Sequence, residues 1–118
     1  MSDDKATFQQ VKGKISEFNK ARNWDHYHNP KDLAMAISIE AAELLENFQW
    51  EMSKSPGEVM ADPIKMANIR DEAADMFIYL LILCNRLDMD ASSLISEKLS
   101  KNETRFPPGQ EHSFRKGR

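Results

Sequence analysis

The sequence has little cysteine, glycine or proline, and each shortage excludes a class of structure. Its 118 residues include one cysteine, Cys84, so no disulfide can form within the chain. A lone cysteine is typical of proteins kept in a reducing compartment, and we expect a cytoplasmic protein with Cys84 as a small core residue. Only 4 glycines and 5 prolines occur. Because these residues interrupt helices most strongly, long stretches are free to be helical.

The chain also lacks an excess of basic residues and a long apolar run. Sixteen lysines and arginines face 19 aspartates and glutamates, which gives a formal net charge of −3. Proteins that bind nucleic acid along its backbone are usually basic, so we expect no nucleic-acid partner. The longest apolar run, Met76 to Cys84, is far shorter than the roughly 20 residues that span a bilayer. The polar, acidic start of the sequence is unlike a secretory signal, and we expect no membrane partner.

What the sequence does contain is helical periodicity. Phe8, Val11, Ile15 and Phe18 fall at spacings of three and four residues, which predicts a helix over residues 7–22. Further helices are predicted over 31–50, 63–87 and 90–103. Each begins at or just after a residue that caps helices well, namely Asn29, Asp62 or Asp90. A proline follows Asn29 and Asp62, where the first position of a helix tolerates it.

These segments predict an all-α protein of the four-helix-bundle type. No alternating strand pattern of useful length is present. We expect one helical domain over residues 1–107. Pro107, Pro108 and Gly109 end the last predicted helix, and the polar, basic stretch 108–118 is predicted to be a flexible tail.

Two pairs of carboxylates interrupt the apolar stripes of the predicted helices. Glu40 and Glu43 are three residues apart, and so are Glu72 and Asp75. This spacing places both members of a pair on one face of a helix. Two such pairs on neighbouring helices would bring four oxygen-rich side chains together. Hard divalent cations prefer this ligand set, and a site that also admits water and phosphate oxygens suits Mg²⁺ or Mn²⁺.

The surroundings of Asp75 strengthen this interpretation. Between Ala73 and Cys84 it is the only charged residue, so we expect a segment that is buried on nearly all sides. A buried carboxylate without a partner is costly, so a basic side chain or a metal ion must compensate it. Lysine and arginine are sparse here, and the nearest on the same predicted helix are Lys65, Arg70 and Arg86.

Two other interpretations compete with the metal site. A pair of glutamates three residues apart is most often a solvated helix face. A ferritin-like di-iron centre would need Glu-x-x-His pairs on core helices. The histidines are His26, His28 and His112, all outside the predicted core helices, and we interpret His26 and His28 as loop residues.

The residues around both carboxylate pairs resemble the MazG-like nucleotide pyrophosphohydrolases, and in particular the small dCTP pyrophosphatase branch. The likeness lies in four segments in the same order: RNWDHYHNPKDL (22–33), IEAAELLENFQW (39–50), DEAADMFIYL (71–80) and KLSKNETRFP (98–107). The motifs E-x-x-E and E-x-x-D of this family correspond here to Glu40/Glu43 and Glu72/Asp75. The resemblance covers roughly residues 8 to 107.

This resemblance implies an activity. It implies Mg²⁺-dependent hydrolysis of a nucleoside triphosphate, such as dCTP or another dNTP, to the monophosphate and pyrophosphate. The four carboxylates would then act both as metal ligands and as catalytic residues. It also implies a homo-oligomer, commonly a tetramer, with active sites formed between subunits.

Two further groups of residues are predicted to bind the substrate. Lys98, Asn102 and Arg105 follow helical spacing on one face. The resemblance implies that Lys98 and Asn102 contact the nucleotide, with Arg105 as an additional candidate for the phosphates. Aromatic rings stack well on nucleobases, and the candidates for the base pocket are Trp24, Trp50 and Tyr79.

The sequence also departs from the family. Some members carry a second glutamate where this chain has Ile39, and the vertebrate dCTP enzymes carry a histidine where it has Ile15. A preference for cytosine therefore does not carry over directly. Two alternatives stay open at this point, a related hydrolase of dUTP or damaged nucleotides and a non-catalytic helical interaction module.

Overall fold

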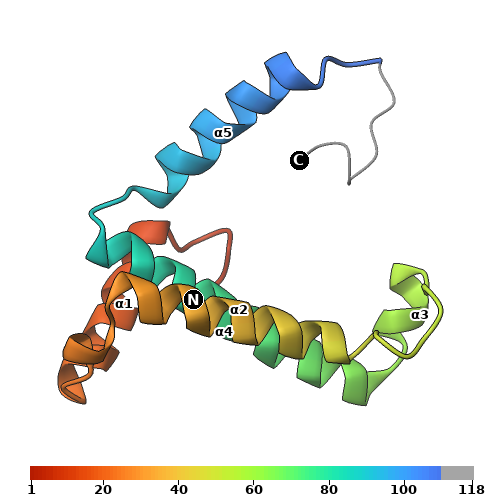
Figure 1. Cartoon of the computed structure of the whole chain (residues 1–118), viewed down its shortest axis with the longest axis horizontal. Helices are drawn as coiled ribbons and strands as arrows, with labels where there is room; N and C mark the ends of the chain where they lie inside the picture. The colour runs from red at the N-terminus through yellow and green to blue at the C-terminus, as the bar shows by residue number, and fades with distance from the viewer. Residues whose placement is uncertain (110–118) are drawn as a thin grey trace. The chain divides into compact units, whose positions relative to one another are not determined.

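A computed structural model describes residues 1–109, and every regular element among them is helical (Figure 1). The predicted all-α class is confirmed for this part of the chain. The described residues fall into two units. The first, residues 1–88, contains α1 (Phe8–Ala21), a 3₁₀ turn (Asp25–Tyr27), α2 (Pro30–Glu46), α3 (Pro56–Met60) and α4 (Pro63–Arg86). The second unit begins at Met89 and contains α5 (Ala91–Arg105).

The predicted caps start the two central helices. The side chain of Asn29 accepts a hydrogen bond from the backbone N–H of Asp32 at 2.9 Å. The Asp62 carboxylate accepts one from the backbone N–H of Lys65 at 3.1 Å. Each satisfies a donor that the first helical turn leaves without a partner. Both α2 and α4 begin with a proline directly after the cap, as predicted.

The pairing of α2 with α4 organises the first unit. The two helices run antiparallel and side by side, and α1 and α3 pack against α4 (Figure 1). The buried apolar side chains of this unit lie on the central pair, and they are Leu33, Leu81, Ile82 and Cys84. The interpretation of Cys84 as a core residue is therefore confirmed. Within residues 1–109 no helix has the length and apolar character that crossing a bilayer requires.

Helix α2 ends earlier than its sequence pattern predicts. It stops at Glu46 instead of continuing to Trp50. The side-chain amide of Asn47 donates to the backbone carbonyl of Leu44 at 3.1 Å. Asparagine side chains compete in this way with backbone bonding, which favours an end to the helix.

Helix α3 is not among the predicted helices, because Ser55, Pro56 and Gly57 indicate a turn. The structure places these residues at the start of a five-residue helix. Ser55 and Glu58 cap it reciprocally, since each side chain accepts a hydrogen bond from the other residue's backbone N–H at 3.3 Å. This capping box outweighs the turn-forming residues that it encloses.

Lys65 ties the start of α4 to the chain that follows α2. Its ammonium group donates to the backbone carbonyl of Asn47 at 2.9 Å and forms an ion pair with Glu51. Glu51 also pairs with Lys54 at 2.6 Å. These contacts hold the end of α2 against the beginning of α4, and they occupy the Lys65 charge away from the carboxylates of interest.

The apolar segment of α4 is buried on one side only, which corrects the expectation of burial on nearly all sides. Within residues 73–84 the side chains of Leu81, Ile82 and Cys84 are buried, whereas Phe77 is 62% exposed. Asp75 is exposed as well. The physical reason is that α2 and α1 cover only part of the circumference of α4, so the rest of its apolar surface has no cover within this unit.

The second unit is described by α5 and its ends. Asp90 caps the helix, as predicted, by accepting from the backbone N–H of Ser93 at 2.9 Å. The helix continues to Arg105, two residues beyond its predicted end. Gly109 has a φ of 83°, a conformation that glycine adopts without strain. The flexible tail predicted over 108–118 lies outside the described residues from position 110 onward.

Candidate metal centre and adjoining cavity

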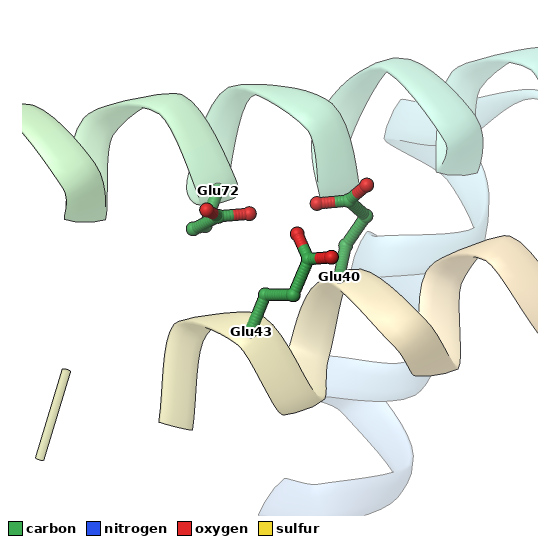
Figure 2. Close-up of side chains that lie close together, drawn as sticks. All are labelled: Glu40, Glu43 and Glu72. Carbon is green, nitrogen blue, oxygen red and sulfur yellow. The ribbon is translucent and has the colours of Figure 1, made fainter. Parts of the chain in front are cut away.

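Three of the four predicted carboxylates meet in one place. Glu40 and Glu43 project from α2, and Glu72 projects toward them from α4 (Figure 2). One carboxylate oxygen from each lies within 4.8 Å of the others. The sequence accounts for this geometry, because the spacing of three residues puts both α2 glutamates on the face that the antiparallel partner helix covers.

Hydrogen bonding among these carboxyls, burial and their like charges together raise the pKa of all three. Contact with the Glu40 carboxyl, together with burial, raises the pKa of Glu72 above its usual value. Contact with Glu72 and the charge of Glu72 raise the pKa of Glu43. For Glu40, hydrogen bonding with Glu72 lowers the pKa, but burial and the charges of Glu43 and Asp75 outweigh it, so the net shift is upward. Like charges held this close favour protonation unless a cation joins them.

Within residues 1–88, no ion pair of a lysine or arginine neutralises the group. Neither ion pair of Lys65 or Lys54 involves it. Arg86 donates to the backbone carbonyl of His28 at 3.1 Å. One oxygen of Glu40, Oε2, is buried and has no hydrogen-bond partner. This buried carboxylate oxygen has no hydrogen-bond donor near it, and two further carboxylates lie beside it. The three carboxylates form a set of oxygen ligands that fits a hard divalent cation.

Asp75 lies beside this group but not within it. The three converging glutamates leave it out, although its charge contributes to the raised pKa of both Glu40 and Glu72. Its role as a fourth metal ligand stays a prediction. Asp75 also borders a cavity, so it stands between the carboxylate group and that cavity.

The cavity has a volume of about 430 Å³, is open to solvent on one side, and is lined by α1, the chain after it, and α4. A volume of this order holds a small organic ligand. Most of its wall is apolar, and a few polar side chains interrupt it. The lining residues are Lys14, Ile15, Phe18, Asn19, Trp24, His28, Asp75, Ile78, Tyr79 and Ile82.

Two of the three aromatic candidates for the base pocket line this cavity. Trp24 follows α1, and Tyr79 lies one turn beyond Asp75 on α4. The ring of Trp24 meets that of Phe18 edge to face, with centroids 5.7 Å apart. Trp50 lies elsewhere, after the end of α2, and it is 89% exposed. Its contact with a base stays a prediction.

The predicted phosphate-binding residues lie in the second unit. Lys98, Asn102 and Arg105 are all on α5, and their helical spacing places them on one face. The guanidinium of Arg105 lies 5.2 Å from the centre of the Phe106 ring. Their contact with a nucleotide stays a prediction.

Sequence reasoning missed two residues of the cavity wall. Asn19 is not among the predicted site residues, although it stands one turn after Ile15 on the apolar side of α1. A polar residue at an apolar position of a helix was the available signal. His28 is predicted to be a loop residue, and it does follow the 3₁₀ turn, but it also lines the cavity. Only the path of the chain back over α4 could reveal this.

The fold and the site together define an all-helical domain in which an antiparallel helix pair brings glutamates together beside an aromatic-lined cavity. Such an acidic site attracts cations. Comparison with known proteins identifies the family of this chain. It belongs to the MazG-like family, which its residues 35–117 match.

Its relatives include enzymes by name. The chain is 32% identical over 101 residues to dCTP pyrophosphatase 1 of Rattus norvegicus and, over the same length, to that of Homo sapiens. These alignments cover 86% of this chain but 59% of either relative, so the chain spans less than two thirds of their length. The crystal structure of a pyrophosphatase from Archaeoglobus fulgidus is similar with a TM-score of 0.75 and 38% identity. That alignment covers 84% of this chain and 91% of the other.

Proposed function

We propose that this protein is a metal-dependent nucleoside triphosphate pyrophosphohydrolase that converts a dNTP, dCTP among the candidates, to the monophosphate and pyrophosphate. The observation that carries the proposal is the convergence of Glu40, Glu43 and Glu72 around a buried, unpartnered carboxylate oxygen. The names of its relatives, dCTP pyrophosphatase 1 and a pyrophosphatase, support the reaction class.

The three glutamates, with Asp75 beside them, would hold Mg²⁺, and Mn²⁺ would suit the same ligands. A bound divalent cation supplies positive charge that draws the triphosphate to an otherwise repulsive acidic site and stabilises charge in the transition state. The protein itself fixes the positions of these ligands, because they project from two paired helices instead of loops. Rigid elements hold such groups more precisely than loops do.

The reaction also requires one of these carboxylates to accept a proton. A water oxygen attacks the α-phosphorus, the bond from that phosphorus to the bridging oxygen breaks, and pyrophosphate leaves. The attacking water loses a proton, which a carboxylate of the group accepts as general base.

Different residues would bind the two ends of the nucleotide, the base and the phosphates. The cavity beside Asp75 would take the base, with Trp24 and Tyr79 offering aromatic surface. Trp50 is a third candidate for that contact. Lys98, Asn102 and Arg105 on α5 would meet the outer phosphates.

The protein would act as a homo-oligomer, with a tetramer as the expected form. Large apolar side chains are exposed on both central helices, among them Ile39, Leu45, Phe77 and Leu80. Exposed apolar surface of this extent marks an interaction site. Copies of the same chain are the simplest partners that would cover it.

A panel of dNTPs and NTPs, incubated with Mg²⁺ or with EDTA, tests the proposal. The products should be the monophosphate and pyrophosphate in equal amounts, and EDTA should abolish their release. The panel should include dUTP and oxidised nucleotides, because their preference would identify a related hydrolase. Release of orthophosphate alone, or no turnover of any nucleotide, would refute the proposed reaction.

A further inference from the structure

The side chain of Asn19 occupies an unusual position in the cavity wall. Asn19 is 5% exposed, and it is the buried polar residue of α1. Its backbone carbonyl accepts hydrogen bonds from the N–H groups of Arg22 and Trp24, at 3.2 and 3.0 Å. The side-chain amide, in contrast, makes no hydrogen bond to another group in the part of the chain that the structure describes.

The amide atoms of Asn19 are not among the fully buried side-chain atoms that lack a hydrogen-bond partner, which are Nδ1 of His28 and Oε2 of Glu40. The amide therefore keeps contact with open space, although the residue as a whole is almost entirely buried. Asn19 lines the cavity together with Ile15 and Phe18, so a ligand in the cavity can reach this amide.

The same wall contains a polar atom that is fully buried and unsatisfied. The Nδ1 atom of His28 is buried and has no hydrogen-bond partner. The remaining wall is largely apolar, with Ile15, Ile78 and Ile82 among its members. Unpaired polar groups in an apolar cavity favour a ligand with a flat apolar body and polar atoms along its edge. Nucleobases have this chemistry.

We propose that Asn19 determines base specificity by hydrogen bonding to the edge of the nucleobase. This inference rests on the proposed function, because the cavity adjoins the carboxylate group through Asp75. The amide presents one acceptor oxygen and one donor NH₂ side by side. That pair complements a base edge carrying an adjacent donor and acceptor. A mismatched base would leave the amide unpaired, and sites of this kind discriminate strongly for that reason.

Substitution separates this role from a structural one. In Asn19→Ala, the ratio of kcat/KM between the best and the worst dNTP should fall about tenfold, the loss expected for one hydrogen bond. The melting temperature should change little, because the amide makes no hydrogen bond within the described residues. Asn19→Asp keeps the shape but loses the donor, so it should change which base is preferred. Lys20→Gln changes the net charge by the same amount as Asn19→Asp, but at the next, exposed position. It should leave the ratio unchanged.

Binding of free deoxynucleosides tests the same contact without any hydrolysis. Adding them in the presence of EDTA should shift the NMR methyl signals of Ile15, Ile78 and Ile82. In Asn19→Ala the differences in affinity between the deoxynucleosides should become smaller. The inference is overturned if Asn19→Ala keeps the base ratio of the wild type, if it melts lower with the ratio unchanged, or if the wild type shows no base preference. Absence of all nucleotide hydrolysis, with deoxynucleoside binding and its dependence on Asn19 intact, would instead refute the proposed reaction alone.

Discussion

Glu40 has the most demanding environment of any carboxylate in the site. One of its oxygens is buried without a donor, and two other glutamates lie close to it. The carboxylate of a surface glutamate, in contrast, forms hydrogen bonds with water on both oxygens. A divalent cation would supply the missing partner and neutralise the repulsion at once. The same residues then explain both the strain in the metal-free protein and the chemistry of the loaded one.

Removing a single carboxylate charge should therefore abolish most of the activity. Glu40→Gln, Glu43→Gln and Glu72→Gln each keep the side-chain size but weaken metal binding. Loss of residues that merely orient a metal ligand typically costs 10–100-fold, so we expect kcat/KM to fall about 100-fold or more for the ligands themselves. Glu17→Gln, an exposed change on α1, is the matched control. Near-normal turnover of all three site variants, measured with Mg²⁺, would contradict the assignment.

The raised pKa values of these glutamates also predict how pH affects stability. In the metal-free protein, a pKa raised above the unfolded value of 4.5 gives stability that is complete below about pH 4.5. This contribution is lost as the pH rises through the raised pKa values. Bound Mg²⁺ replaces the protons, so the increase in melting temperature on adding Mg²⁺ should be larger at pH 7.5 than at pH 5.

The control for this effect is the triple variant Glu40→Gln/Glu43→Gln/Glu72→Gln. Its melting temperature should respond little to Mg²⁺ at either pH. Comparing it with the wild type removes the opposite contribution of Glu58, whose pKa is lowered by hydrogen bonds from Ser55. An equal Mg²⁺ effect at both pH values in the wild type would show that these carboxyls do not exchange protons for the metal.

At the scale of the helix, the site depends on how α4 begins. Asp62 fixes the start of α4, and Glu72 lies along the same helix, so the cap helps to set the register of the carboxylates. Asp62→Ala should lower the free energy of unfolding by about 1 kcal/mol. Asp62→Asn, which retains a capping oxygen, should lose much less. Denaturant unfolding measures both, and equal losses would show that the cap is not the cause.

The sequence predicts the helices of this fold better than their limits. Asn29 and Asp62, each followed by proline, mark the starts of α2 and α4 because their side chains bond locally to the backbone. The end of α2 and the existence of α3 depend on competing side-chain hydrogen bonds, those of Asn47 and of Ser55 with Glu58. Periodicity does not report on such competition.

The same limit applies to the site. Spacing along α2 and α4 is a local property, so the convergence of Glu40, Glu43 and Glu72 was predictable. Asn19 and His28 reach the cavity through the packing of α1 and the following turn against α4. Packing of this kind is not encoded in any one segment. Trp50 lies after the end of α2 and is not among the residues that line the cavity.

At the scale of the whole molecule, the exposed apolar side chains of α4 predict self-association. Phe77 is 62% exposed in the single chain, and burying it against another copy would stabilise an oligomer. Light scattering should therefore give a mass several times that of one chain. Phe77→Glu should shift the mass toward the monomer, while Phe77→Leu should not. A wild-type protein that scatters as a single chain would contradict the oligomer.

The central claim, that the glutamates of α2 and α4 hold a divalent cation, has a direct test. Crystals grown with Mn²⁺ and a non-hydrolysable dNTP analogue would be measured at the manganese absorption edge. We predict an anomalous peak bounded by the carboxylates of Glu40, Glu43 and Glu72, with the phosphates of the analogue against it. A fully occupied nucleotide with no anomalous peak between these three side chains would contradict the claim.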